Sequence, residues 1–166
     1  MLNNSKYGYD IKGNVIRLSL LRSPKWPDPT ADRGKHSIEY SLYPHAGSWR
    51  DANTVRRGYE FNYPLVGELT DVHKGDLPPQ QSFVQLSPSN LVLTGLKKAE
   101  DGDGWIVQWY DAKGEESEAV VTFPRELKRA TISNFLEEEG ASLSIVKNSV
   151  RVKTKKSSVV TVKVSF

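Results

Sequence analysis

The sequence predicts an all-β protein built from antiparallel β-sandwiches, with one short helix. Apolar and polar residues alternate with a period of two in many segments, which is the pattern of half-buried strands. Turn residues recur about every ten residues in the second half of the chain, as they do in β-sandwiches. The final run Val159–Val164 is dense in β-branched residues, which favour strands.

Short strands and a stiff loop are predicted in the first part of the chain. Val15–Leu21 is rich in strand-forming residues and follows a turn at Lys12-Gly13-Asn14. Ser23–Pro29 contains three prolines, which exclude a helix and a central strand because proline lacks a backbone N–H. His36–Tyr43 alternates cleanly and is predicted to be a strand.

One helix is predicted from about Trp49 to Glu60, because apolar residues recur there at the three- and four-residue spacing of a helical face. Ser48 stands where an N-cap residue would accept a backbone hydrogen bond. Asp51 would place a carboxylate in the first turn, where it favours the helix dipole. The sequence Asn62-Tyr63-Pro64 is expected to end the helix.

Residues 66–81 lack any period and carry glycines and prolines, so they are predicted to be a linker or long loop. Residues 82–166 are predicted to form a C-terminal β-sandwich domain. The expected strands of that domain are Ser82–Leu86, Leu91–Lys98, Trp105–Tyr110, Glu118–Phe123, Arg129–Asn134, Ser142–Lys147, Ser149–Lys153 and Val159–Phe166.

The composition is that of a soluble globular protein, with 37% hydrophobic and 26% charged residues. Cysteine is absent, which excludes disulfides, thiolate nucleophiles and cysteine-based zinc sites. The N-terminus does not resemble a signal peptide, and no stretch approaches the ~20 apolar residues that span a bilayer. We therefore expect a cytoplasmic protein that has no membrane partner.

The net charge of +3 is too small to indicate binding to nucleic acid. The last 26 residues are nevertheless basic and carry no acidic residue, which predicts a solvated face of terminal strands where lysine also hinders edge pairing. The basic residues concerned are Lys147, Arg151, Lys153, Lys155, Lys156 and Lys163.

The sequence contains no recognisable catalytic or metal-binding constellation. Its three histidines are not spaced as metal ligands. Asp101–Gly104 resembles half of a calcium loop but lacks the remaining ligand positions, so a β-turn is predicted. The run Glu137–Glu139 is predicted to be a solvent-exposed loop rather than an acid/base pair. Catalytic and metal-ligating residues are therefore predicted to be absent from this chain.

A proline-stiffened loop from Lys25 to Gly34 is the best candidate for binding, specifically of carbohydrate. An aromatic ring can stack on the C–H face of a sugar, and a carboxylate can accept hydrogen bonds from its hydroxyls. The stretch Lys6–Asp10 offers similar chemistry. For both segments, packing against a neighbouring domain is an equally good interpretation. The carbohydrate-binding candidates are Trp26, Asp28, Asp32, Arg33, Tyr7 and Tyr9.

Several segments in one colinear series resemble glycoside hydrolase family 38 α-mannosidases, beginning with Leu2–Asp10, which is similar to a family segment reading LNDSKYGYD. The similarity spans nearly the whole chain and weakens after Gly140. The other matching segments are Arg17–Pro24, Pro27–Gly34, Tyr40–His45, Trp49-Arg50, Leu96–Gly102 and Asn134–Glu138.

The resemblance implies that residues 1–65 are the end of a large central β-supersandwich and that residues from about 82 form the final small sandwich. It also implies an enzyme with two catalytic aspartates and a zinc ion held by His and Asp. The nucleophilic aspartate and most of the zinc ligands would lie in an N-terminal catalytic half. Because this chain lacks that half, we expect no cofactor in it and no activity of the isolated chain. The implied partners are the catalytic domain or subunit and a mannoside.

Two functions remain open at this stage. The chain is either a non-catalytic portion of an α-mannosidase or a free-standing carbohydrate-binding sandwich that uses exposed tryptophans. Trp105 and Trp109 share strand parity, so we expect both in the core. An incomplete supersandwich would leave strand edges and apolar surface exposed, which predicts a partner chain or a homo-oligomer formed through a strand edge.

Overall fold

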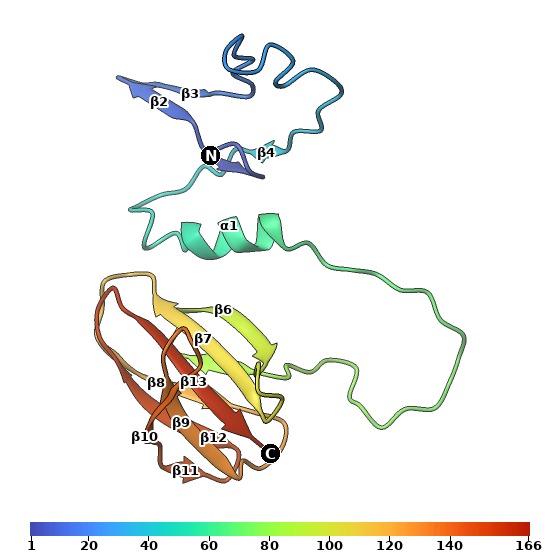
Figure 1. The fold of residues 1–166 in the computed structure, drawn as a ribbon, viewed down its shortest axis with the longest axis vertical. Coiled ribbons are helices and arrows are strands. Elements are labelled where there is room, and N and C mark those ends of the chain that lie inside the picture. The colour runs from blue at the N-terminus through green and yellow to red at the C-terminus, as the bar shows by residue number, and fades with distance from the viewer. The chain divides into compact units, whose positions relative to one another are not determined.

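A computed structural model describes residues 1–166, which divide into two units (Figure 1). The N-terminal unit is Met1–Leu69 and the C-terminal unit is Thr70–Phe166. Strands in antiparallel pairs dominate both units and only one helix is present, which confirms the predicted all-β sandwich class. That helix has nine residues, so no helix of this chain is long enough to cross a bilayer.

The C-terminal unit is a sandwich of two antiparallel sheets (Figure 1). One sheet has five strands in the order β10-β9-β13-β7-β6, and the other has four in the order β11-β12-β8-β5. The strands are β5 (Gln85–Ser87), β6 (Leu91–Lys98), β7 (Trp105–Asp111), β8 (Ser117–Thr122), β9 (Arg129–Ser133), β10 (Glu139–Ser142), β11 (Ile145–Val146), β12 (Ser149–Thr154) and β13 (Val159–Ser165).

The core of this sandwich lies between its two sheets, and both sheets contribute to it. Trp109 on β7 and Val162 on β13 are fully buried against Val121 on β8 and Val150 on β12. The indole Nε1 of Trp109 donates a hydrogen bond to Thr154 Oγ1 at 3.0 Å, which satisfies its buried polar atom. The valine-rich sequence of β13 suits its position between β7 and β9, where both edges of the strand are hydrogen-bonded and one face packs into the core.

Asp111, at the end of β7, ties together three chain segments at one end of the sandwich. Its side chain is buried and accepts hydrogen bonds from the Asn90 side chain (2.9 Å), from the backbone N–H groups of Lys113 (3.1 Å) and Glu115 (2.8 Å), and from Ser157 N–H (2.8 Å). Burial alone would raise the pKa of Asp111. The hydrogen bonds together lower this pKa by more than burial raises it, so the pKa lies below its usual value.

The N-terminal unit contains two small antiparallel pairs and the helix. β2 (Tyr9–Lys12) and β3 (Val15–Leu18) form a hairpin, and β1 (Leu2–Asn3) pairs with β4 (Tyr40–Ser41). The helix α1 (Thr54–Asn62) contacts β1. The predicted turn at Lys12-Gly13-Asn14 connects the hairpin strands, and Gly13 adopts the positive φ of 60° that this turn requires.

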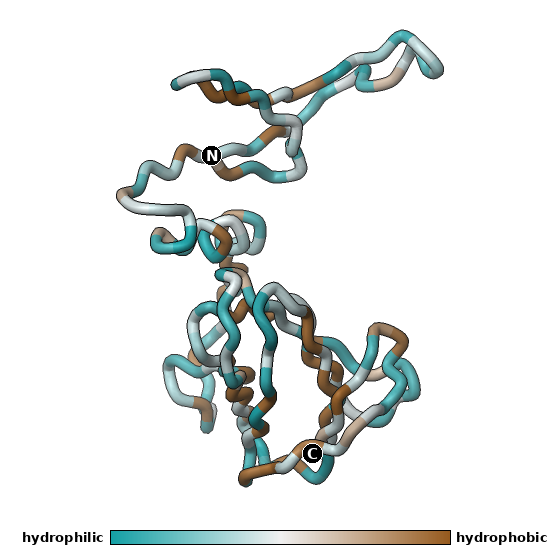
Figure 2. The backbone as a smooth tube through the Cα atoms, turned by 90° about the vertical axis from the view of Figure 1, so that its left-hand side faces the viewer, coloured by the Kyte–Doolittle hydropathy of each residue, from teal (hydrophilic) through white to brown (hydrophobic).

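The N-terminal unit has no buried residue, although hydrophobic positions recur along both units (Figure 2). Even α1 has none, despite its apolar stripe. A folded unit normally buries its apolar side chains, because their transfer from water is the main driving force for folding. These strands and the helix therefore lack the surface against which they would form a core.

Several local predictions were wrong. The helix begins at Thr54 rather than near Trp49, because Ser48 and Asp51 hydrogen-bond to each other in a preceding turn. Only Tyr40–Ser41 of the segment His36–Tyr43 is a strand, since no further partner strand is present for the rest. Trp105 is 42% exposed while Trp109 is buried, because Trp105 stands at the open end of β7.

The predicted strand Ser142–Lys147 is two strands that belong to different sheets. β10 ends at Ser142 in the five-stranded sheet, and β11 begins at Ile145 in the four-stranded sheet. The linker predicted at residues 66–81 contains no helix or strand. The proposed domain limits at residues 65 and 82 stay a prediction.

Candidate functional site

The loop predicted to bind carbohydrate is shaped by its own carboxylates. Asp32 Oδ2 accepts a hydrogen bond from Ser23 N–H at 2.9 Å, which closes the loop across nine residues. Asp28 Oδ1 accepts from Thr30 N–H at 2.8 Å and from Thr30 Oγ1 at 2.7 Å. A further contact joins His36 Nε2 to the Asp32 carbonyl at 2.9 Å. These short-range hydrogen bonds fix the backbone on which Trp26 and Arg33 are carried.

Trp26, near the start of this loop, is 84% exposed, and Arg33 is exposed as well. The hydroxyl of Thr30, and then its N–H, hold the pKa of Asp28 below its usual value, so this carboxylate is ionised at neutral pH. One oxygen of Asp28 and one of Asp32 have no hydrogen bond within the loop. The loop thus carries an exposed aromatic ring and two carboxylates with free acceptor oxygens, which is chemistry suited to a sugar.

Tyr7 and Tyr9 lie on the segment that leads into the hairpin, not in this loop. Tyr7 is 89% exposed, and the Tyr9 hydroxyl accepts a hydrogen bond from Asn3 Nδ2 at 2.6 Å. No hydrogen bond or ring contact connects either tyrosine to the loop. Sugar binding by these six residues stays a prediction.

The β2–β3 hairpin has one apolar face and one charged face. Its register pairs Tyr9 with Leu18 and Ile11 with Ile16, which places these four side chains together. The opposite face carries the Asp10–Arg17 ion pair. Ile11 and Ile16 are both at least half exposed. The hairpin therefore presents apolar surface and two strand edges that no other strand of this chain pairs.

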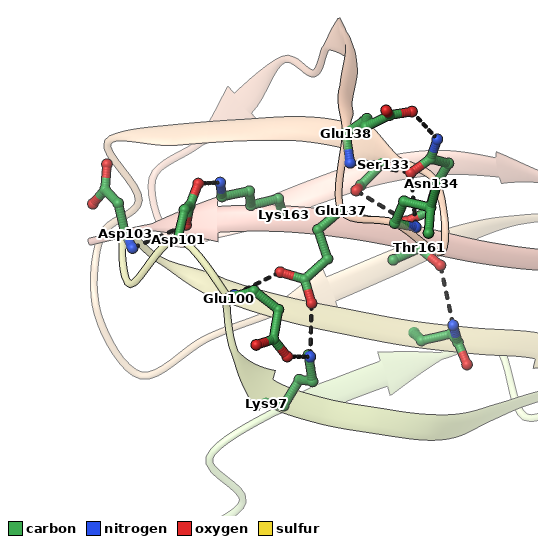
Figure 3. Close-up of polar contacts among 12 residues, drawn as sticks. Lys97, Glu100, Asp101, Asp103, Ser133, Asn134, Glu137, Glu138, Thr161 and Lys163 are labelled. Carbon is green, nitrogen blue, oxygen red and sulfur yellow. Dashed lines mark hydrogen bonds and ion pairs between the residues drawn. The ribbon is translucent and has the colours of Figure 1, made fainter.

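A polar cluster on the C-terminal unit was missed by sequence reasoning (Figure 3). Glu137 reaches from the loop between β9 and β10 to Lys97 at the end of β6, with 2.7 Å between Oε1 and Nζ. Its Oε2 accepts from Glu100 N–H at 2.7 Å. Lys97 also pairs with the Glu100 carboxylate. The prediction that Glu137–Glu139 are simply solvent-exposed was wrong for Glu137, whose side chain is only 12% exposed.

These contacts shift the ionisation of both partners in the cluster. Lys97 lowers the pKa of Glu137, assisted by the Glu100 N–H. The Glu100 carboxylate, followed by that of Glu137, raises the pKa of Lys97. Both groups are therefore charged at neutral pH, and their charges offset each other.

A second ion-pair group surrounds Lys163 on β13. Its side chain is only 8% exposed and pairs with Asp101 and, at 3.2 Å, with Glu139. Arg129 also pairs with Glu139. Asp101 raises the pKa of Lys163 although burial opposes this, and Lys163 in turn lowers the pKa of Asp101. The expectation that the basic C-terminal residues are all solvated was thus wrong for Lys163, and the Asp101 turn holds a lysine rather than half of a calcium site.

A lysine flanked by valines in a β-branched strand is the sequence signal that could have indicated this burial. An ammonium group in that position requires carboxylate partners. The sequence could not say which carboxylates these are, because Asp101 lies 62 residues away and meets Lys163 only through strand pairing.

The zinc ion expected in the full-length enzyme stays a prediction. The structure contains no group of three or more His, Cys, Asp or Glu side chains that could hold a metal ion. His36 and His45 instead contact backbone carbonyls in their own loops. His73 does the same in the linker region.

Two models of known protein families match this chain. The model for the glycosyl hydrolases family 38 C-terminal beta sandwich domain matches residues 90–163, which is most of the two-sheet sandwich. The model for the glycosyl hydrolases family 38 C-terminal domain matches residues 1–30, which include the hairpin and Trp26. The chain belongs to glycosyl hydrolase family 38. It represents the C-terminal β region of that family.

Curated family 38 relatives extend the similarity over most of the chain. Alpha-mannosidase G of Dictyostelium discoideum is 36% identical over 86% of this chain, which is 13% of that protein. Alpha-mannosidase 2C1 of Mus musculus is 35% identical over 83% of this chain and 13% of its own length. Alpha-mannosidase of Saccharomyces cerevisiae is 35% identical over 82% of the chain and 14% of its length. The chain therefore spans only a small part of the relatives it matches.

Proposed function

We propose that this chain is the non-catalytic C-terminal β portion of an α-mannosidase and acts as a scaffold for a catalytic region formed by other residues. The observation that carries the proposal is the N-terminal unit, whose strands and helix bury no residue. In this proposal, zinc-dependent retaining hydrolysis belongs entirely to the catalytic region. Relatives that are several times longer than this chain supply the room for such a region.

The apolar face of the hairpin is the proposed contact with that region. Ile11, Ile16 and their neighbours would be covered by further strands, with β2 or β3 extended by pairing at its open edge. Burying an isoleucine completely contributes about 1.5–3 kcal/mol, so the hairpin face alone offers a substantial driving force. We propose the catalytic region as the occupant in place of a second copy of this chain, because the relatives carry the matching segment within one long polypeptide.

The loop around Trp26 is the proposed contribution of this chain to the mannoside site. Its backbone is fixed by Asp28 and Asp32, and it exposes an indole face that no residue of the chain covers. It would line the rim of the site and touch the sugar without reacting with it.

The test is to express the full chain together with the catalytic region of a family 38 α-mannosidase. We expect a stable complex on size-exclusion chromatography and zinc-dependent hydrolysis of an aryl α-mannoside by the complex, while the pure chain shows no turnover. Ile11→Asp combined with Ile16→Asp should abolish the complex, since two buried carboxylates without partners are strongly unfavourable. Asp10→Asn is the matched control on the charged face and should leave the complex intact.

Turnover by the pure chain would refute the scaffold assignment, and so would a complex that survives the two isoleucine substitutions. Trp26→Ala tests the rim assignment separately. It should leave the complex and its zinc content unchanged and raise KM for the mannoside, whereas an unchanged KM would remove the loop from the sugar site.

A free-standing carbohydrate-binding module is the second candidate, and the exposed indole of Trp26 favours it. Titration of the isolated chain with mannose, followed by tryptophan fluorescence, distinguishes the two functions. Saturable binding that is lost in Trp26→Ala would support an autonomous module that uses this loop.

A further inference from the structure

The outer face of the five-stranded sheet carries a hollow that the scaffold role does not explain. The core side chains Val107, Trp109 and Val162 point between the sheets, so the residues that alternate with them point outward. The strand registers align Gly95 on β6 with Gln108 on β7, and Gln108 with Thr161 on β13. These three residues form one row across the sheet and are the floor of the hollow.

The walls of the hollow come from the end of β6 and from the loop between β9 and β10. Lys97 and Ile106 stand beside the floor, and Asn134, Phe135 and Glu137 overhang it. The cavity volume is about 230 Å³. Small-molecule sites are typically roughly 300–1,000 Å³, so the hollow is a small one that can hold a single sugar ring.

The overhanging loop is held rigidly in place (Figure 3). Asn134 Oδ1 accepts hydrogen bonds from the N–H groups of Leu136 (2.9 Å) and Glu138 (3.0 Å). Asn134 Nδ2 donates to Glu138 Oε2 at 2.7 Å. Glu137 is fixed at the far side by Lys97 and by the Glu100 N–H. A site that is already ordered binds a ligand without the loss of loop entropy that ordering would cost.

Hydrogen-bonding capacity remains on the floor after the internal contacts are made. Gln108 Nε2 donates to Thr161 Oγ1 at 3.2 Å, and Gln108 Oε1 accepts from Thr94 Oγ1 at 3.2 Å. An amide has two N–H donors and two acceptor lone pairs, so one of each is left for a ligand. The carboxylate of Glu137 can likewise accept further hydrogen bonds beside those from Lys97 and the Glu100 N–H.

The chemistry of the lining selects a neutral ligand that is rich in hydroxyls and has one apolar face. Lys97 and Glu137, the two charged side chains of the lining, pair with each other, so the lining itself carries no net charge. Glu100 also pairs with Lys97 from outside the hollow, which leaves no positive charge for an anionic ligand. Phe135 is 74% exposed at the rim and offers a ring face for C–H groups. Planar amide and carboxylate groups opposite an aromatic ring suit the paired hydroxyls of a pyranose.

We infer that this hollow is an accessory binding site for a neutral glycan, formed by Gly95, Gln108, Thr161, Glu137 and Phe135. It lies on residues other than those of the Trp26 loop, and it does not depend on the scaffold role. Glycine at position 95 keeps the floor open. A Cβ there would lie 3.4 Å from the Gln108 Cβ, on the face that the ligand would occupy.

The test is titration of the isotopically labelled chain, residues 1–166, with α-mannobiose, cellobiose and lactose, monitored by backbone amide NMR. We expect saturable shifts at residues 94–97, 106–108 and 134–137 for at least one of these disaccharides. Gly95→Val should abolish the shifts by filling the floor with a strand-favouring residue. Phe135→Ala should weaken affinity about tenfold by removing the stacking face.

Two matched controls locate the site. Leu136→Ala changes an exposed apolar neighbour of Phe135 that does not line the hollow, and Trp26→Ala removes the ring of the other candidate loop. Both should leave the affinity unchanged, and the β13 amides should show that every variant remains folded. The inference is overturned if none of the disaccharides gives saturable shifts, if the shifts are confined to residues 23–36, or if Gly95→Val binds as the parent does.

Discussion

Both units of this chain contain antiparallel strand pairs, but they differ in whether they possess a core. The C-terminal unit places β7 and β13 against β8 and β12, with Trp109 fully buried between them. The N-terminal unit has a hairpin, a second strand pair and a helix, and none of its residues is buried. The difference shows that a segment can have the sequence pattern of strands and a helix and still form no core of its own. The stability of such a segment must come from packing against residues outside it.

Comparing alanine substitutions of Trp109 and Trp26 measures this difference directly. Trp109→Ala should give the largest change in the free energy of unfolding. Trp109→Ala removes a fully buried indole together with its hydrogen bond to Thr154, and should lower the free energy of unfolding by about 3–5 kcal/mol. Trp26→Ala removes an exposed indole and should change it by less than about 0.5 kcal/mol. Denaturant unfolding followed by far-ultraviolet circular dichroism compares the two variants. Equal losses would mean that the N-terminal unit has a core of its own.

Asp111→Asn should have the next largest effect, and that effect should depend on pH. Loss of the charged acceptor leaves several N–H donors poorly satisfied, which costs about 1–3 kcal/mol at neutral pH. Because the folded-state pKa of Asp111 is depressed, its contribution is fully present above the unfolded-state pKa of about 3.9 and is lost as pH falls through the lower folded-state pKa. Unfolding midpoints of parent and variant should therefore converge in acid. A difference that stays constant from neutral pH to strong acid would contradict this account.

The hairpin should give the smallest effect on the isolated chain. Replacing Ile11 and Ile16 together by serine should change the free energy of unfolding by less than about 0.5 kcal/mol, because both side chains are already exposed. The variant should also be more soluble, since it removes paired apolar surface. Calorimetry and the concentration dependence of light scattering measure these two quantities. A clear loss of thermal stability would show that the isoleucines are buried in solution.

The sequence predicted the sandwich well where a strand's pattern matched its surroundings. The strand at Leu91–Lys98 was located with its observed limits, because the alternation, the flanking turns and the sheet agree there. The strand predicted at His36–Tyr43 shrank to Tyr40–Ser41, because its alternation is suited to partner strands that this chain does not contain. A periodic pattern indicates the face that a segment would bury, and it cannot show whether the covering surface belongs to the same chain.

The candidate sites were predictable to different degrees for a related reason. Trp26 could be found because its loop concentrates prolines, an indole and carboxylates within a few consecutive residues. The hollow above Gln108 could not, because Gly95, Thr161 and Phe135 meet only after the four strands β6, β7, β13 and β9 have paired in register. Glu137 looked like part of a solvated acidic run, and its role became visible only through its contacts with Lys97 and Glu100.

Amide hydrogen exchange on the full chain tests most directly whether the N-terminal unit depends on an absent surface. We expect strong protection in β7, β12 and β13, at the level of global unfolding, and almost none in β2, β3 and α1. Protection of β2 and β3 comparable to that of β13 in the isolated monomer would contradict the account, because it would require a core that residues 1–69 form by themselves.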